Sequence, residues 1–212
     1  MNASTRIGAI ALLIVGYAGA APVTAQDLRE IAREHGRRNP GAVLEHTAPP
    51  ADYLLQTIEE VATQADVVLQ GTLARARSYL GADADRVLTD YRIVGPQVIS
   101  GSLPALTAAR PGTTTPLTLT VYGGEVTFEG VRIRSTDNNR AAIEDGGRYV
   151  VALRRSRSSK PGHYEVHNGA IFEVKEGRVT PLIKQADRVF KGTVDSDASQ
   201  LISRLRAARK GR

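Results

Sequence analysis

The sequence predicts a mostly β fold, a small antiparallel β-barrel with N-terminal helices and a C-terminal helix. Three observations predict it. Apolar residues alternate with polar ones along several segments between Val67 and Ile183, as they do along half-buried strands. Glycines and the Gly95–Pro96 pair interrupt these long segments, and bends of this kind let strands close into a small barrel. The longer helical patterns lie before and after this β region.

Residues 1–25 have the three-part pattern of a cleavable signal peptide. Arg6 provides the positive start, residues 7–21 are mostly apolar, and small residues precede Gln26. Cleavage is expected after Ala25, with export to the periplasm or the extracellular space. The alternative is an uncleaved N-terminal anchor. A lipoprotein is excluded because that route needs a cysteine, and the chain has none.

Residues 26–64 are expected to form a helical arm and a linker. Helical spacing of apolar residues predicts a first helix over residues 27–38 and a second over residues 52–64, with Asp52 as the cap of the second. Residues 39–50 contain prolines and glycine and are interpreted as the linker.

Residues 65–195 are expected to form the barrel. Asn168-Gly169 predicts a hairpin turn, and residues 137–144 predict a short helical turn. Residues 196–212 predict a basic C-terminal helix with a narrow apolar stripe. The strands are expected over residues 67–79, 87–99, 117–122, 125–135, 148–154, 163–167, 171–174 and 179–183.

The order of these elements resembles the netrin-like modules, which are OB-type barrels best known from tissue inhibitors of metalloproteinases. The resemblance rests on residues 65–73 (ADVVLQGTL), a second strand over residues 91–99, Gly101, residues 117–119 (LTL) and residues 147–153 (GRYVVAL). It implies an OB-like β-barrel. Those inhibitors chelate a protease zinc ion with a disulfide-tied N-terminal cysteine. This chain has no cysteine, so the resemblance carries over the fold and not the inhibitory site.

Candidate catalytic and metal-binding groups do not combine into a known pattern. His163 and His167 are expected on one face of a strand about 13 Å apart, which is too far for direct bonds to one ion. His35 and His46 lack partners at ligand spacing, and Ser100-Gly101-Ser102 lacks the pattern of a serine elbow. The acidic pairs Glu59-Glu60 and Glu144-Asp145 are interpreted as surface residues. No phosphate-binding glycine motif is present, so no catalytic site, metal or cofactor is predicted.

Two groups of basic residues are the candidate binding residues. The chain has a formal net charge of +6, and much of that charge lies at its C-terminal end. We therefore do not expect the main part of the protein to bind nucleic acid in a sequence-specific way. Loops of OB barrels bind single-stranded nucleic acids or sugars, so the first group is a candidate for binding a polyanion. The first group is Arg154, Arg155, Arg157 and Lys160, and the second is Arg204, Arg206, Arg209 and Lys210.

The sequence thus favours an exported, non-enzymatic domain that binds a protein or a polymer, with no transmembrane segment in the mature chain. Two alternatives remain open. One is an exported hydrolase with an unrecognised site built from acids. The other is a polyanion or envelope-surface binder that uses the basic loop and the basic tail.

Overall fold

A computed structural model of the chain describes residues 27–39, 41, 43–47, 53–103, 116–156, 162–191, 194 and 197–210, without the side chain of Lys210. The expected signal peptide and its cleavage point lie outside these residues. The helices are α1 (Leu28–Arg38), α2 (Ile58–Gln64), α4 (Ala186–Val189) and α5 (Ala198–Lys210). The strands are β1 (Val43–Thr47), β2 (Val67–Leu80), β3 (Val87–Gly101), β4 (Thr118–Tyr122), β5 (Gly124–Phe128), β6 (Val131–Thr136), β7 (Gly147–Arg155), β8 (His163–Lys175) and β9 (Arg178–Pro181).

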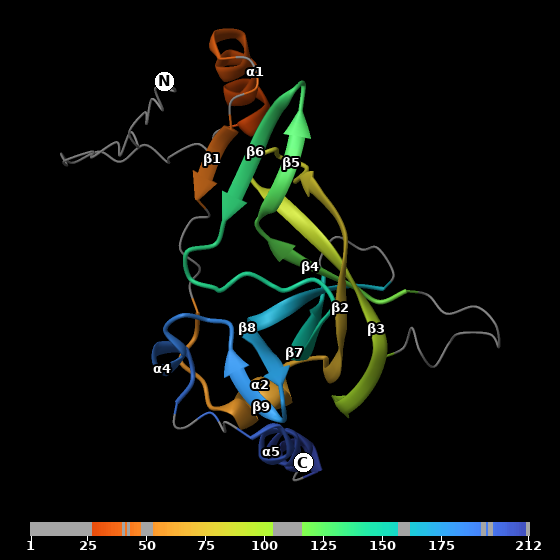
Figure 1. Cartoon of the computed structure of the whole chain (residues 1–212). Coiled ribbons are helices and arrows are strands. Elements are labelled where there is room, and N and C mark those ends of the chain that lie inside the picture. Colours follow the sequence, from red (N-terminus) through yellow and green to blue (C-terminus); the bar gives the residue numbers. More distant parts are fainter. Residues whose placement is uncertain are drawn as a thin grey trace.

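The fold is mostly β, as predicted, and its centre is a closed OB-like barrel. A six-stranded sheet has the order β4-β3-β2-β7-β8-β9, and it closes on itself because β4 also pairs with β8. The ring therefore contains five strands, β2, β3, β4, β7 and β8. In Figure 1 the barrel forms the lower part of the molecule, α2 and α5 lie at its base, and a separate three-stranded sheet with α1 lies above it.

One pairing in the barrel departs from the expected antiparallel arrangement. β4 and β8 run parallel where they meet, with Thr118 opposite His163 and Thr120 opposite Glu165. A parallel pair needs a long crossover rather than a tight turn, and here the crossover includes β5, β6 and β7. The barrel encloses its own apolar core, which includes Leu69, Leu119 and Leu153, all fully buried.

The predicted bend at Gly95-Pro96 is confirmed. The β2–β3 register passes from Gln70 opposite Gln97 to Thr72 opposite Val94, so an extra residue of β3 bulges out at this point. Gly95 has a φ of +59°, a conformation that glycine adopts without steric cost. The bulge bends a long strand so that it can follow the barrel wall.

The predicted hairpin at Asn168-Gly169 is wrong. β8 is continuous through this dipeptide and pairs with β7 on both sides of it, so the dipeptide is a bulge within one strand. Both residues have positive φ values, +46° and +68°, which is why the pattern resembles a turn. The Asn168 side chain accepts a hydrogen bond from Leu54 N and donates one to Leu54 O, each 2.8 Å long. These bonds fix the bulge against the segment before α2.

Three other local predictions are also wrong. Residues 125–135 are not one strand but the hairpin of β5 and β6, because Glu129 and Gly130 both have positive φ values and turn the chain. Residues 39–50, expected as a linker, include β1, which pairs in parallel with β6. Residues 137–144 do not form a helix; residues 138–139 form a turn, and Arg140 then forms an isolated β-bridge with Ile183.

The expected helices are present at both ends of the described chain. α1 is capped by Asp27, whose side chain accepts a hydrogen bond from Arg29 N. α2 begins at Ile58, later than predicted, because Thr57 and Glu60 form a capping box there. The predicted cap Asp52 lies outside the described residues. Leu54 lies within the predicted helix 52–64, but it precedes α2 in the structure and is 65% exposed.

α5 packs against the outside of the barrel. Leu201 and Leu205 of its predicted stripe are fully buried, in a cluster with α2 and the outer face of the barrel sheet. This second apolar cluster holds the C-terminal helix in a defined position, and with it the arginines that the helix carries.

Candidate functional site

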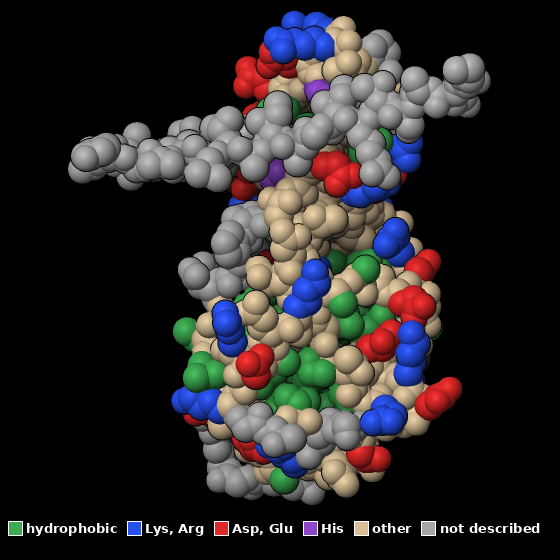
Figure 2. Space-filling model, turned by 60° about the vertical axis from the view of Figure 1, so that its left-hand side comes forward, with side chains coloured by type: hydrophobic (Ala, Val, Ile, Leu, Met, Phe, Trp, Pro, Cys, Tyr) green, Lys and Arg blue, Asp and Glu red, His purple; other side chains and the backbone are tan. Residues whose placement is uncertain are grey.

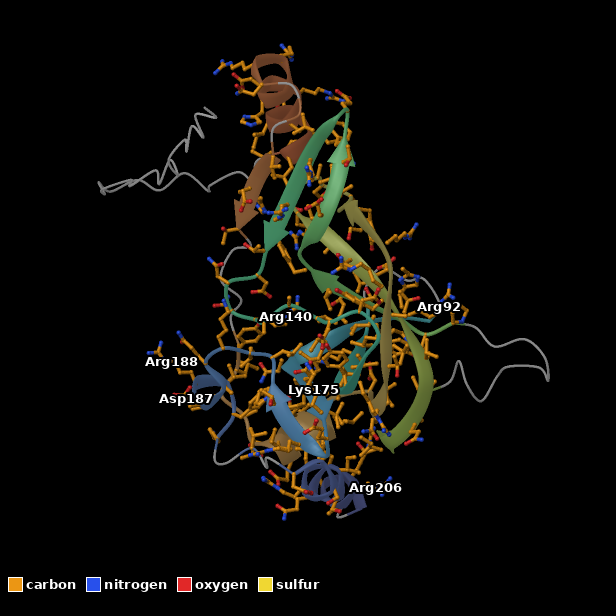
Figure 3. All side chains as sticks on the ribbon, viewed as in Figure 1. Arg92, Arg140, Lys175, Asp187, Arg188 and Arg206 are labelled. Carbon is orange, nitrogen blue, oxygen red and sulfur yellow. The ribbon has the colours of Figure 1, made fainter. Side chains whose placement is uncertain are left out.

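The structure places the described members of the two predicted basic groups at one end of the barrel. Arg154 and Arg155 are exposed at the end of β7, and Arg206 is exposed on α5. In Figure 3 Arg206 projects from α5 at the base of the molecule. Arg157 and Lys160 lie outside the described residues, as does the side chain of Lys210.

Asp66 connects the two groups. Its backbone N–H donates to Leu153 O over 2.9 Å, which holds it beside β7. Its carboxylate oxygen Oδ2 accepts a hydrogen bond from Arg155 N at 2.7 Å, and its carbonyl oxygen accepts one from Arg209 Nη1 at 3.2 Å. Residues at the end of β7 and at the end of α5 therefore meet at the same backbone position. We call this surface, made of Arg154, Arg155, Arg206 and Arg209, the basic corner.

The basic corner combines four arginines with one acid, Asp66, whose carboxylate accepts a hydrogen bond from the backbone N–H of Arg155. Arg209 donates to a backbone carbonyl, which carries no net charge and so does not neutralise the guanidinium. Arg204 differs from it, because it forms an ion pair with Glu59 of α2 at 2.7 Å and links the two helices. Arg204 thus has a structural role in fixing α5, and the neighbouring arginines of that helix are better placed for a ligand.

On the face drawn in Figure 2 basic side chains have a different arrangement. There, hydrophobic side chains are exposed over the lower part of the molecule, and Lys and Arg side chains stand apart from one another among them. A ligand with closely spaced negative charges needs several cations within its reach, so this face is a poorer candidate than the basic corner.

The position of the basic corner in the barrel agrees with the usual binding edge of OB barrels. β7 and β8 are the fourth and fifth strands of the ring in chain order, and the loop between these two strands is one that OB barrels use for oligonucleotides and sugars. Arg92 of β3 lies opposite Thr118 of β4, which in turn lies opposite His163 at the start of β8.

His167 is buried and lies close enough to the basic corner to be influenced by its charges. Burial and then the positive charge of Arg154 lower the pKa of His167, while Asp66 raises it. Its Nε2 atom is buried and has no hydrogen-bond partner among the described residues. The ring is 5% exposed, so it is a core group and not a surface ligand.

The other sequence candidates also have structural roles. Glu59 pairs with Arg204, Glu144 pairs with Lys175 at 2.9 Å, and Asp145 Oδ1 accepts a hydrogen bond from Arg75 N at 2.7 Å. Within the described part of the chain, no cluster of three or more His, Asp or Glu side chains could hold a metal ion.

Sequence reasoning missed a group of cavities beside Arg140. Cavities of about 480, 200 and 350 Å³ share lining residues, among them Arg140, Asp137, Tyr53 and Lys184. Arg140 lies between the three-stranded sheet and the barrel in Figure 3. The signal in the sequence was the polar run Asp137-Asn138-Asn139-Arg140, which predicts a turn but gives no indication of what the turn covers.

Fold and surface together define the class as an OB-like barrel domain with a basic corner beside the end of its fourth strand. Comparison of the chain with protein-family models, with curated proteins and with solved structures found no match. The resemblance to netrin-like modules therefore stays a prediction. None of the described helices combines the length and apolar character that a membrane crossing requires.

Proposed function

We propose that the protein is an exported, non-enzymatic binding domain, and that the basic corner binds a polymer with closely spaced negative charges. The observation that carries the proposal is the pair of hydrogen bonds to Asp66, one from the backbone N–H of Arg155 and one from the side chain of Arg209. Because of these bonds, two basic groups that lie far apart in the sequence act as one surface, next to a loop of the kind that binds polymers in other OB barrels.

The expected binding is electrostatic and depends on salt. Each arginine that neutralises a charge of a flexible polyanion releases about 0.7 counterion. If the four described arginines of the basic corner all take part, the logarithm of the association constant should fall with the logarithm of salt concentration with a slope of about −3. The described part of the corner offers no stacked aromatic residues, so we expect little sequence or base preference.

Retention of the full chain on a sulfated polysaccharide column, over a series of salt concentrations, tests the proposal. The variant Arg154→Gln/Arg155→Gln and the variant Arg206→Gln/Arg209→Gln should each elute at clearly lower salt than the parent protein. Arg37→Gln/Arg38→Gln is the matched control, because it removes the same charge from two adjacent exposed arginines of α1. Equal losses in all three variants would mean that only net charge matters, and would refute the basic corner.

One observation favours a second candidate function, hydrolysis. Asp137 and Glu165 line the same cavity of about 200 Å³. Both acids already have partners, since Asp137 Oδ1 accepts a hydrogen bond from Asn139 N at 2.9 Å and Glu165 Oε1 accepts one from Ser156 Oγ at 2.6 Å. Turnover on panels of glycosidase and protease substrates that disappears in Asp137→Asn or Glu165→Gln would replace the binding proposal with this one.

A further inference from the structure

The cavities beside Arg140 lie where β4 and β8 separate in the barrel wall. β4 and β8 pair from Thr118 to Thr120 only, and the rest of β4 leaves β8. The gap is crossed by the segment after β6, which is bonded to the segment after β9. Ala141 N donates to Leu182 O over 2.7 Å, and Lys184 N donates to Asn139 O over 2.8 Å. The frame around the cavities is thus hydrogen-bonded backbone and not a loose loop.

Arg140 is the charged group at the centre of this frame. Its side chain is 10% exposed, and Nη2 donates to Tyr122 O at 2.7 Å. Asp137 Oδ2 lies 3.5 Å from Arg140 Nε, yet Nε is buried and has no hydrogen-bond partner within the described part of the chain. A buried cation with an unused donor is costly, because the protein has replaced water without supplying the hydrogen bond that water gave.

The charge and shape of the larger cavity fit a small organic anion. Arg75, Arg140 and Lys184 line it with one acid, Asp137, so positive charge exceeds negative charge there. Apolar side chains, Val121 and Ile143 among them, line part of the remaining wall, and Ser135, Thr136 and Asn138 line another part. Its volume of about 480 Å³ is in the range of small-molecule sites, which combine apolar walls with a few fixed polar groups.

The neighbouring tyrosines keep the site free of further negative charge. Burial raises the pKa of Tyr53, and the charge of Asp137 raises it further, while Arg140 lowers it. Burial also raises the pKa of Tyr122. Both phenols therefore stay neutral at neutral pH; Tyr122 lines the larger cavity and Tyr53 the two smaller ones.

We propose that this cavity, which we call the Arg140 cavity, binds the carboxylate of a small organic acid. The carboxylate lies at Arg140, whose planar guanidinium matches the two oxygens of a carboxylate, and the apolar part of the acid lies against Val121 and Ile143. Lys184 at the exposed rim attracts the anion. The site goes beyond the proposed function, because none of its residues belongs to the basic corner.

The test uses the full chain labelled with ¹⁵N and titrated with straight-chain carboxylates of four to eight carbons and with benzoate. At least one acid should shift the amide signals of Gly123, Gly124, Ala141 and Ala142, which line the cavity. The matching neutral amide should shift them at least tenfold more weakly. If no acid shifts them at about 10 mM, or if acid and amide act equally, the proposal is overturned.

Two variants test whether Arg140 and Lys184 bind the carboxylate. Arg140→Lys keeps the charge but loses the planar donor pair, and should weaken binding of the acid about tenfold. Because this buried change can impair folding, Lys184→Met at the exposed rim is the second variant, and it should weaken binding severalfold. Lys191→Met, another exposed lysine that does not line these cavities, is its matched control and should bind as the parent does. Unchanged binding in Lys184→Met together with Arg140→Lys would overturn the assignment.

The test also separates this site from the polyanion surface. Arg154→Gln/Arg155→Gln should leave the carboxylate titration unchanged while it reduces retention on the polysaccharide column. If that variant abolishes the carboxylate shifts, the acid binds at the basic corner and the Arg140 cavity is not its site. A protein that binds the acid but shows no salt-dependent retention would keep this inference and reject the proposed function.

Discussion

Replacing Leu205 by alanine should weaken the packing of α5 on the barrel and lower the free energy of unfolding. Leu205 is 1% exposed and belongs to the cluster between α5, α2 and the barrel sheet. At about 0.8 kcal/mol for each buried carbon removed, the lost transfer free energy is roughly 2.5 kcal/mol. The space left behind raises the expected loss in free energy of unfolding to about 3–4 kcal/mol.

Urea unfolding followed by far-ultraviolet circular dichroism measures this loss. For a chain of this size the melting temperature should fall by roughly 10 °C. Leu54→Ala is the matched control, because Leu54 is the same residue type but is 65% exposed, and it should change stability by less than about 0.5 kcal/mol. If the two variants had equal stability, α5 would not be packed on the barrel, and the argument that it brings Arg209 to Asp66 would fail.

Two further predictions concern the bulge in β8 and the buried histidine near it. In urea unfolding, Gly169→Ala should destabilise the protein by about 2 kcal/mol more than Gly130→Ala. Both glycines have positive φ values, so both variants carry backbone strain. Only at Gly169 would the added Cβ atom also overlap the side chains of Ile183 and Tyr53. The pKa of His167 is lower in the folded chain than in the unfolded chain, so as the pH falls the unfolded state takes up the proton first. His167→Gln should therefore lose less free energy of unfolding between pH 7 and pH 5 than the parent protein does.

The outcomes that contradict these two predictions are specific. Equal losses at Gly169 and Gly130 would mean that the bulge is not packed as described. For the histidine, the contribution is present above its ordinary pKa and is lost as the pH falls below that value. A variant that loses as much stability as the parent protein between pH 7 and pH 5 would mean that His167 is not held neutral in the folded chain.

The strands and the end helices could be predicted because each carries its own periodicity. The alternation that begins at Val67 and the stripe of Leu201 and Leu205 depend only on which face of the element is buried, and a sequence window records that directly. The Gly95-Pro96 bulge was also predictable, because proline cannot donate to a ladder wherever the strand lies.

The errors arose where local chemistry allows two outcomes and distant contacts decide between them. Asn168-Gly169 suits a hairpin turn as well as a bulge, and its hydrogen bonds to Leu54, far away in the sequence, select the bulge. β1 is a short segment between prolines and glycines, and it becomes a strand only because β6 lies beside it. Neither partner can be identified from a window of neighbouring residues.

The two candidate sites differ in the same way. Residue type alone identifies the arginines of the basic corner, although the sequence does not show that Asp66 brings Arg155 and Arg209 together. The Arg140 cavity has no such signal. A single arginine after a turn is ordinary in sequence, and its importance comes from burial and from a donor without a partner, which depend on segments that meet only in the folded chain.

The parallel pairing of β1 with β6 constrains the order in which parts of the chain can fold during synthesis. His46 and Ser135, which face each other across this pairing, are 89 residues apart, so β1 is synthesised long before its partner exists. Contacts that close such long loops form late in folding because the entropy of closure must be paid first. During synthesis residues 43–47 are therefore made long before β6, and they can take up their strand pairing only after residues 131–136 have been added to the chain.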